Sequence, residues 1–261
     1  EWFEAIILGL VQGLTEFLPV SSSGHLEIGK VLLGVDIPKD TMTMFSVMVH
    51  AATVLSTIIV FRKQIWSLLK GFFKFQYNDQ TDYLFKIAVS MVPIMIVGLL
   101  FKDDVEEALF GSIKVVGFAL LLTSALLFFS DIASRSANAV KDTSGVKVAR
   151  NGISYWQAFV VGLSQALAVI PGLSRSGTTI STGLICGVRR DVMAQFSFLM
   201  VLVPILGETF LEIVGGEFGA STVGALPLVL GFVSAFLSGL FACKVMIALV
   251  KRAKLRWFAL Y

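Results

Sequence analysis

The chain has 261 residues, of which 56% are hydrophobic and only 15% are charged, with a net charge of +3. Soluble domains carry about 25% charged residues, so a single globular core would not bury this much apolar surface. The composition excludes a disordered chain, a secreted disulfide scaffold and a typical cytosolic enzyme. The apolar runs are continuous rather than alternating, which argues against a porin-type barrel. We therefore expect an all-α, polytopic membrane protein.

The first apolar run is too short to cross a bilayer. It covers residues 4–18 and stops at Pro19 and a Ser-Ser-Ser-Gly tip, after which a second short run covers 26–35. A spanning helix needs about 20 apolar residues. A helix, a Gly/Ser-rich tip and a short returning helix predict a re-entrant hairpin over residues 4–35. One tilted, broken helix that crosses the membrane is the alternative.

The rest of the chain repeats this plan. A second hairpin is expected at 157–188, where Pro171-Gly172 and Ser174-Arg175-Ser176-Gly177 form the tip. We divide the chain into a first repeat (1–130), a cytoplasmic loop (131–156) and a second repeat (157–261). The second repeat is expected to lack a final helix, because the span 115–130 of the first repeat has no counterpart in it. The expected spanning helices are 43–61, 83–101 and 115–130 in the first repeat, and 194–214 and 225–250 in the second.

The two hairpins are related in sequence. With an offset of 153 residues, eight of 21 positions match between residues 5–25 and 158–178. Three spans follow the first hairpin, and an odd number turns the second repeat upside down. Inverted repeats place a shared site near the bilayer midplane, where broken helices meet.

The basic residues support this topology. Fourteen Lys and Arg residues lie in the loops and tail on one side of the expected layout, and three lie on the other. The positive-inside rule places the first set in the cytoplasm. The basic residues therefore indicate the sidedness of a multi-pass membrane protein and give no sign of nucleic-acid binding.

Polar residues at the tips are the candidates for chemistry. Gln12 and Glu16 share a helix face, and a carboxylate in an apolar segment is functional by default. At the offset of 153, Arg175 replaces Ser22 and Thr178 replaces His25. Gly-rich tips that open short helices offer backbone N–H groups to anions, and arginine binds phosphate through two hydrogen bonds. The sequence thus predicts a phosphate site inside a membrane.

Other polar residues in apolar segments are interpreted as structural. His50 is expected to make a packing hydrogen bond within its span, while Lys86 is expected to extend its ammonium group to the membrane surface. Glu27, which follows His25 by two residues, and Glu208 are left unassigned.

The two tip motifs resemble those of the undecaprenyl pyrophosphate phosphatase family, also called the bacitracin-resistance proteins. The family's first motif, (Glu/Gln)-x-x-x-Glu, is met by Gln12 and Glu16. Its second, Pro-Gly-x-Ser-Arg-Ser-x-x-Thr, is met by residues 171–179. Gln12 is the less acidic family option, which weakens a metal role for that residue.

The resemblance implies hydrolysis of the C55 isoprenyl pyrophosphate to its monophosphate and phosphate, which recycles the lipid carrier of cell-wall synthesis. It also implies a divalent cation, Mg²⁺ or Ca²⁺, held by Glu16 and Gln12, and an active site open to the outer face. A homodimer is left open. The resemblance implies Glu16, His25 and Arg175 as the main catalytic positions, with Ser22, Ser174 and Thr179 as supporting ones. From the residues themselves we expect Ser22 to be catalytic as well, and the other tip hydroxyls to bind substrate: Ser21, Ser23, Ser174, Ser176 and Thr179.

The reaction steps and one rival function remain open at this stage. Ser22 is the favoured nucleophile with His25 as its base, but His25 could attack directly or activate water with Glu16. The rival is a secondary transporter or a lipid flippase for an anionic substrate, because transporters also use inverted repeats with paired hairpins.

Overall fold

The computed structural model describes residues 2–34, 39–101, 104, 112–140, 149–215, 224–252 and 254–261. These residues form helices and connecting turns, and no strand occurs among them, so the all-α prediction is confirmed. The helices are α1 (Trp2–Phe17), α2 (Ser22–Leu33), α3 (Lys39–Val60), α4 (Arg62–Phe72), α5 (Asp79–Leu100), α7 (Ile113–Val140), the 3₁₀ turn η1 (Arg150–Gly152), α8 (Tyr155–Leu167), α9 (Arg175–Ile185), α10 (Arg190–Val214), α11 (Ala225–Arg252) and α12 (Arg256–Leu260).

The long helices have the length and apolarity of membrane spans. Within the described residues, four helices meet both conditions, namely α5, α7, α10 and α11. A fifth candidate is the pair α3 and α4, which is bent by 75° at Phe61. The chain is therefore a multi-pass membrane protein.

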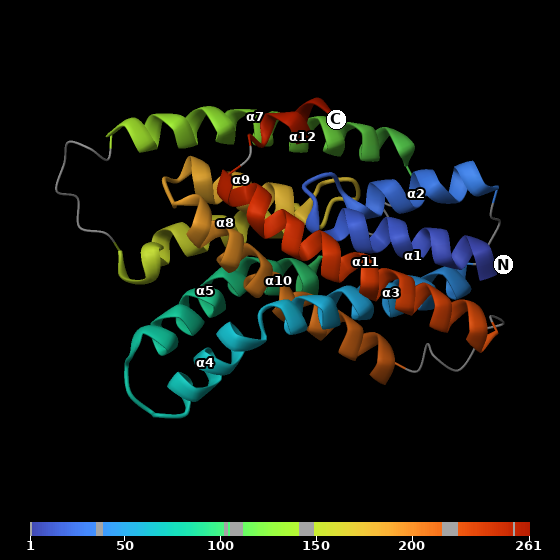
Figure 1. Ribbon diagram of the computed structural model, residues 1–261, viewed down its shortest axis with the longest axis horizontal. Coiled ribbons are helices and arrows are strands. Elements are labelled where there is room, and N and C mark those ends of the chain that lie inside the picture. The colour runs from blue at the N-terminus through green and yellow to red at the C-terminus, as the bar shows by residue number, and fades with distance from the viewer. Residues whose placement is uncertain are drawn as a thin grey trace.

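The two short helix pairs enter the bundle from opposite ends. Helices α1 and α2 extend toward one end of the long axis, while α8 and α9 extend toward the other (Figure 1). The breaks between the paired helices, at residues 18–21 and 168–174, meet in the middle of the molecule. Their inverted orientation in a membrane, and the repeat boundaries, stay predictions.

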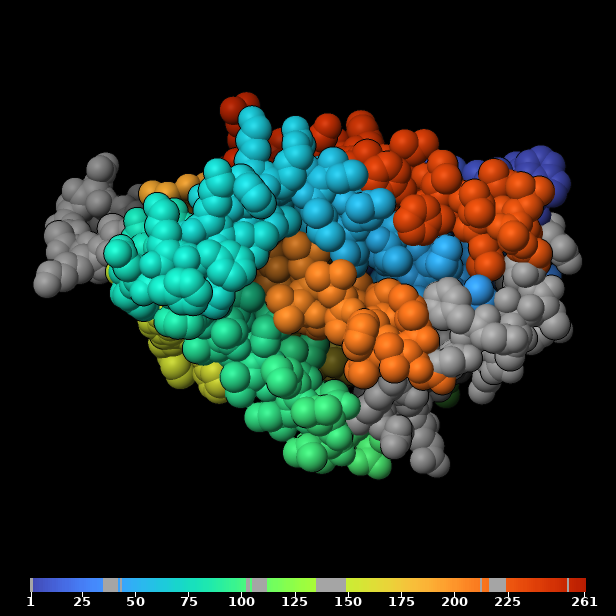
Figure 2. All heavy atoms as spheres, turned by 90° about the horizontal axis from the view of Figure 1, so that it is seen from below, coloured from blue at the N-terminus to red at the C-terminus, as the bar shows by residue number. Residues whose placement is uncertain are grey.

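Small residues allow α1 to lie against α11. A Cβ atom built on Gly13 would come within 2.6 Å of the carbonyl oxygen of Ala235, and one on Gly9 within 2.5 Å of that of Gly231. Such close helix approach through small residues is typical of membrane bundles. Helix α10 fills the centre of the lower face, between α3, α4 and α5 (Figure 2).

Two predicted loops are partly helical. The segment 62–82, which connects the expected spans 43–61 and 83–101, contains α4 and the first turn of α5. The predicted cytoplasmic loop 131–156 begins with the last ten residues of α7, which continues to Val140, and residues 141–148 lie outside the described part of the chain. The expected helix ends were therefore wrong, because helix formation continues past the point where the sequence stops being apolar. The cytoplasmic position of these connections stays a prediction.

The interpretation of Lys86 was also wrong. Lys86 is only 2% exposed, and its ammonium group donates to Asp82 at 2.6 Å and to the carbonyl of Arg150 at 2.7 Å. Asp82 also accepts from Tyr77 and Asn151. The hydrogen bond to Asp82 raises the pKa of Tyr77 above its ordinary value. This network ties α5 to η1, since a buried charge is stable only when paired.

Candidate active site

The two hairpin tips use the same capping arrangement. Ser21 is the N-cap of α2, and its hydroxyl accepts from the backbone N–H of Gly24 at 3.2 Å. Ser174 is the N-cap of α9, and its hydroxyl accepts from the N–H of Gly177 at 3.1 Å. Serine caps satisfy N–H groups that a first helical turn leaves unpaired. Each tip therefore directs a helix N-terminus, with its partial positive charge, toward the centre of the molecule.

Hydrogen bonds join the two tips. The N–H of Gly172 donates to the hydroxyl of Ser23 at 3.2 Å, and the hydroxyl of Ser176 donates to the carbonyl of Leu18 at 3.2 Å. A Cβ atom on Gly177 would lie 3.1 Å from that of Pro19. Segments about 150 residues apart in sequence are therefore in direct contact.

Glu16 lies at the centre of the polar groups. Its Oε2 atom accepts from the hydroxyl of Ser22 at 2.7 Å and from the side-chain amide of Gln12 at 2.9 Å. The Nε2 atom of His50 lies 3.9 Å from the same oxygen. The Glu16 side chain is only 10% exposed, so these groups replace most of the water that a carboxylate otherwise requires.

Arg175 faces the same space from the other hairpin. Glu16 and Arg175 line one cavity of about 20 Å³, with Thr53, Thr57 and Ser176 as further polar residues. The Nη1 atom of Arg175 is buried and has no hydrogen-bond partner within the described part of the chain. A buried guanidinium nitrogen without an acceptor is costly unless a ligand supplies one. The remaining wall is apolar: Phe17, Val54, Phe198, Val201, Leu202 and Ile205.

The two ring nitrogens of His25 face groups other than Ser22. Its Nδ1 atom lies 2.8 Å from the carbonyl oxygen of Ser21, and its Nε2 atom lies 2.9 Å from the hydroxyl of Tyr261. The His25 and Tyr261 rings are stacked at 5.8 Å. The sequence analysis favoured His25 as the base for Ser22, whereas in this structure the hydroxyl of Ser22 donates to Glu16.

His50 contributes to the site, although the sequence interpretation gave it a packing role. Its Nδ1 atom is 2.8 Å from the carbonyl of Ser46, one turn earlier on α3. A ring nitrogen beside a carbonyl carries a proton, so Nδ1 donates to Ser46, and Nε2 is the nitrogen that faces Glu16. A signal was available, because an ionisable residue in an apolar span marks a functional site by default.

The five predicted substrate-binding hydroxyls are engaged within the protein. Ser21 and Ser174 cap helices, and Ser23 and Ser176 join the tips. Thr179 is fully buried, and its hydroxyl lies 2.6 Å from that of Ser197 on α10. In this structure these residues shape the site, and their binding role stays a prediction.

The donor set suits a hard cation with few protein ligands. Gln12 is fully buried, and its Oε1 atom has no partner among the described residues. This oxygen and the Glu16 carboxylate are the type of ligand that Mg²⁺ and Ca²⁺ take, and Mg²⁺ leaves most positions to water and phosphate. The described residues contain no group of three or more His, Cys, Asp or Glu side chains placed to hold a metal. Two oxygen ligands therefore fit a cation that is completed by the substrate.

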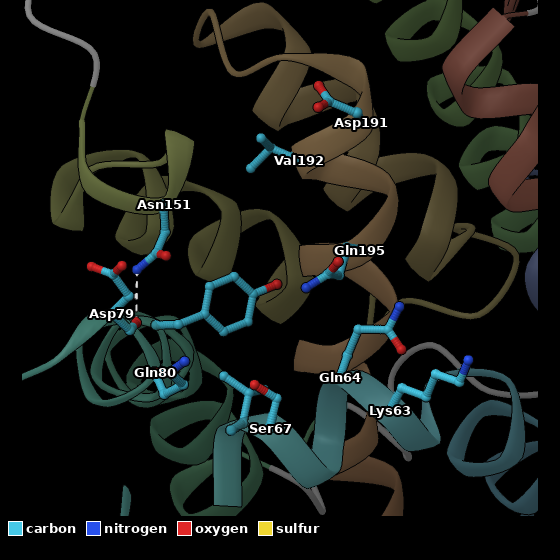
Figure 3. A pocket seen from close by; sticks show the side chains of 11 residues that line it. Lys63, Gln64, Ser67, Asp79, Gln80, Asn151, Asp191, Val192 and Gln195 are labelled. Carbon is cyan, nitrogen blue, oxygen red and sulfur yellow. Dashed lines mark hydrogen bonds between the residues drawn. The ribbon is translucent and has the colours of Figure 1, made fainter. Parts of the chain in front are cut away.

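A larger cavity of about 480 Å³ lies elsewhere, between α4, α5, α10 and η1 (Figure 3). Its two carboxylates are already paired, Asp79 with Arg150 and Asp191 with Arg189 at 2.7 Å. Neither tip motif contributes to its lining, which includes Gln64, Gln80, Asn151 and Gln195. The larger cavity therefore lacks the chemistry of the smaller one.

Comparison with known proteins identifies the family to which this chain belongs. The family described as "Bacitracin resistance protein BacA" matches residues 5–261. An undecaprenyl-diphosphatase of Bacteroides fragilis is 50% identical over 265 residues, which cover 100% of this chain and 94% of the relative. That of Parabacteroides distasonis is 51% identical over 263 residues, with the same coverage. That of Alkaliphilus metalliredigens is 36% identical over 271 residues, covering 99% of this chain and 94% of the relative. The chain belongs to the bacitracin resistance protein BacA family.

Proposed function

We propose a route by which this chain acts as an undecaprenyl-diphosphatase, the activity for which its relatives are named. The chain is a membrane hydrolase that cleaves the phosphoric anhydride bond of the C55 isoprenyl pyrophosphate. The products are the monophosphate and phosphate, so the reaction returns the lipid carrier to cell-wall synthesis. Transport or lipid flipping as an alternative function receives no support.

One observation carries the assignment of the site. Arg175, whose buried Nη1 atom has no hydrogen-bond partner among the described residues, lines the same cavity as Glu16, whose carboxylate accepts from Ser22. On this ground we assign phosphate binding to Arg175, nucleophilic attack to Ser22 and proton acceptance to Glu16. Each hairpin tip supplies a part, so neither tip is complete alone.

Ser22 is the proposed nucleophile. Its oxygen attacks the terminal phosphorus, the bond from that phosphorus to the bridging oxygen breaks, and undecaprenyl monophosphate leaves. The hydroxyl proton passes to Glu16, which already accepts it in a hydrogen bond of 2.7 Å. Water then hydrolyses the phosphoserine and releases phosphate. A positioned base within hydrogen-bond reach is the arrangement that activates serine.

His25 has a different role in this proposal. Its ring faces the carbonyl of Ser21 and the hydroxyl of Tyr261, one helical turn from Ser22. From there it orients the tip and is placed to protonate the leaving group after a rotation of its side chain. The contact between Ser22 and Glu16 supports Glu16 over His25 as the base in the attack.

Arg175 and the two helix N-termini bind the phosphate oxygens. The guanidinium fork fits two oxygens of one phosphate, and the first turns of α2 and α9 add backbone N–H groups and dipoles of the same sign. These groups stabilise the charge that develops in the transition state.

Gln12 and Glu16 are the residues that would hold a divalent cation. A divalent cation held there would neutralise the negative charge of the phosphate groups. The buried Oε1 atom of Gln12, which has no hydrogen-bond partner among the described residues, supports this assignment. Because Oε2 of Glu16 carries the bonds from Ser22 and Gln12, the other carboxylate oxygen is the one assigned to the cation.

The site must enlarge when substrate enters. A cavity of about 20 Å³ holds little more than one water, which is less than a diphosphate group needs. Its apolar wall, formed by side chains of α3 and α10, is the proposed path for the isoprenyl chain. Binding therefore requires α10 or α3 to move, since the charged head must reach Arg175 while the tail stays in lipid.

The site is proposed to open toward the outer face of the membrane. The excess of Lys and Arg at the end that carries α4 and the connection from α7 to α8 supports a cytoplasmic position for that end. Glu27 on α2 and Ser67 on α4 are both exposed. The experiment uses a variant of the protein in which Cys186 and Cys243 are replaced by Ser, with one new cysteine introduced at a time. In whole cells, we expect an impermeant thiol reagent to label Glu27→Cys from outside and Ser67→Cys only after permeabilisation. The reverse pattern would invert the topology.

The function is tested by phosphate release from purified protein in detergent. We expect turnover of undecaprenyl pyrophosphate and a loss of turnover when divalent cations are chelated. Failure to release phosphate from this substrate, in protein shown to be folded, would contradict the proposal.

A further inference from the structure

The connection between α3 and α5 has an unusual charge distribution. Residues 62–78 contain four basic residues and no Asp or Glu: Arg62, Lys63, Lys70 and Lys74. Helix α4, at the start of this segment, turns by 75° away from α3. A helix that follows a membrane span at such an angle lies close to the plane of the membrane surface. Figure 1 shows α4 projecting from one end of the bundle.

The outward side of this segment is apolar. Trp66 is 60% exposed, Phe73 64% and Phe75 86%. The rings form edge-to-face pairs, Phe72 with Phe73 at 5.6 Å and Phe73 with Phe75 at 6.5 Å. Together with Leu69, these four aromatic residues form what we call the α4 patch. Exposed apolar groups gathered in this way mark an interaction surface.

Basic side chains lie beside the apolar ones. The ammonium group of Lys70 is 5.2 Å from the centre of the Trp66 ring, and Lys74 follows Phe73 directly in the sequence. Aromatic rings at headgroup level, with lysines that extend toward phosphates, are typical of helices that lie in a membrane interface.

The α4 patch is held in a fixed orientation. On the inner side of α4, Ile65 and Leu68 pack on the hydrophobic core. Gly71 lies against Gln80 of α5, and its carbonyl accepts from the side chain of Asn78 at 2.8 Å. The inner side is therefore already occupied, and the patch is the side left for a partner.

We propose that the α4 patch binds a bilayer surface that contains anionic phospholipid. The aromatic residues enter the headgroup region, and Lys70 and Lys74 pair with lipid phosphates. Four cations without an acid match a negatively charged surface. The same charge disfavours a second copy of the chain as the occupant, because a symmetric contact would bring like charges together.

The test measures how lipids quench Trp66 fluorescence. Trp2, Trp156 and Trp257 are changed to Phe, and the protein is placed in nanodiscs of phosphatidylcholine, alone or mixed with phosphatidylglycerol. In each sample one of the two lipids, phosphatidylcholine or phosphatidylglycerol, carries bromine near the headgroup end of its acyl chains. We expect strong quenching by both lipids and a severalfold stronger effect of brominated phosphatidylglycerol at equal mole fraction.

Paired charge variants supply the control. The double variant Lys70→Gln, Lys74→Gln is expected to lose the preference for phosphatidylglycerol, whereas Lys70→Arg, Lys74→Arg is expected to keep it. Both should release phosphate from substrate in detergent as the parent does, which shows that they are folded. Equal quenching by the two lipids in the parent protein would overturn the proposal. So would absence of quenching, as expected if a second copy covered the patch.

Discussion

Ser21 and Ser174 occupy equivalent positions in the two hairpins, and each caps the helix that follows by accepting from a glycine N–H three residues later. Each also lies near a second serine, Ser23 at 3.3 Å in one tip and Ser176 at 3.4 Å in the other. The capping arrangement is thus repeated, although the φ of the cap residue is 70° at Ser21 and −65° at Ser174.

The tips differ in the side chains that this arrangement presents. The first hairpin carries Glu16 and Ser22, and the equivalent positions in the second carry Val169 and Arg175. The first tip therefore supplies the acid and the nucleophile, and the second supplies the cation. Capping serines and glycines thus build the scaffold that the two hairpins share, whereas the proposed catalytic residues lie at positions where the two hairpins differ in sequence.

The largest expected effect is at Ser22. Ser22→Ala removes the proposed nucleophile and should reduce kcat about a thousandfold or more, while substrate binding is largely kept. Ser23→Ala is the matched control, because Ser23 lies next to it but accepts a bond from Gly172. Steady-state phosphate release measures both. Comparable losses in the two variants would mean that Ser22 acts only as part of the tip.

The variant Glu16→Gln tests the role of the carboxylate that the first hairpin supplies. Glu16→Gln keeps the shape but not the charge, so we expect about a hundredfold lower kcat or more and a weaker dependence on Mg²⁺. Titration of activity with Mg²⁺ separates the two effects. A variant with lowered kcat but an unchanged Mg²⁺ requirement would remove Glu16 from the cation site.

Arg175 tests the contribution of the second half. Arg175→Lys keeps the charge but loses the fork, and we expect about a hundredfold loss in kcat. Arg189→Lys is the control, because that exposed arginine lies away from the tips and pairs with Asp191. If Arg175→Lys turned over nearly as well as the parent, a point charge would suffice and bidentate binding would be wrong.

His50 should show a smaller effect, because it acts through Glu16. His50→Ala removes the group 3.9 Å from the carboxylate, and a loss of about tenfold in kcat follows if the interaction contributes about 1.4 kcal/mol to the transition state. His50→Gln retains a donor and should recover part of the loss. Equal activity of all three proteins would return His50 to a packing role.

Gly172 should affect stability more than chemistry. Its φ of 92° and a Cβ position only 2.7 Å from the carbonyl oxygen of Val116 both oppose a side chain. We expect Gly172→Ala to lower the free energy of unfolding by about 1–3 kcal/mol. Gly98→Ala is the control, because a Cβ there meets nothing within 4 Å. Thermal unfolding in detergent compares them.

Features that depend on nearby residues were predictable from the sequence. The short apolar runs, the Ser/Gly tips and the spacing of Gln12 and Glu16 indicated the hairpins and the residues that face each other. The buried ion pair of Asp82 and Lys86 was also visible as an i, i+4 pair, although it was interpreted otherwise.

Contacts between distant helices were not predictable in the same way. The approach of His50 to Glu16 depends on how α3 packs against α1, and the engagement of Thr179 with Ser197 depends on α9 and α10. Neither pair follows from periodicity. Helix ends were unpredictable for a related reason, since α7 continues into a polar sequence where hydropathy gives no signal.

The central claim is that Ser22 of one tip attacks a phosphate held by Arg175 of the other. The most direct measurement is rapid quenching of the enzyme with undecaprenyl pyrophosphate labelled at its terminal phosphate, followed by mapping of the modified residue. The account predicts label on Ser22, absent in Ser22→Ala and strongly reduced in Arg175→Ala. Label on His25, or turnover without any phosphorylated enzyme, would contradict it.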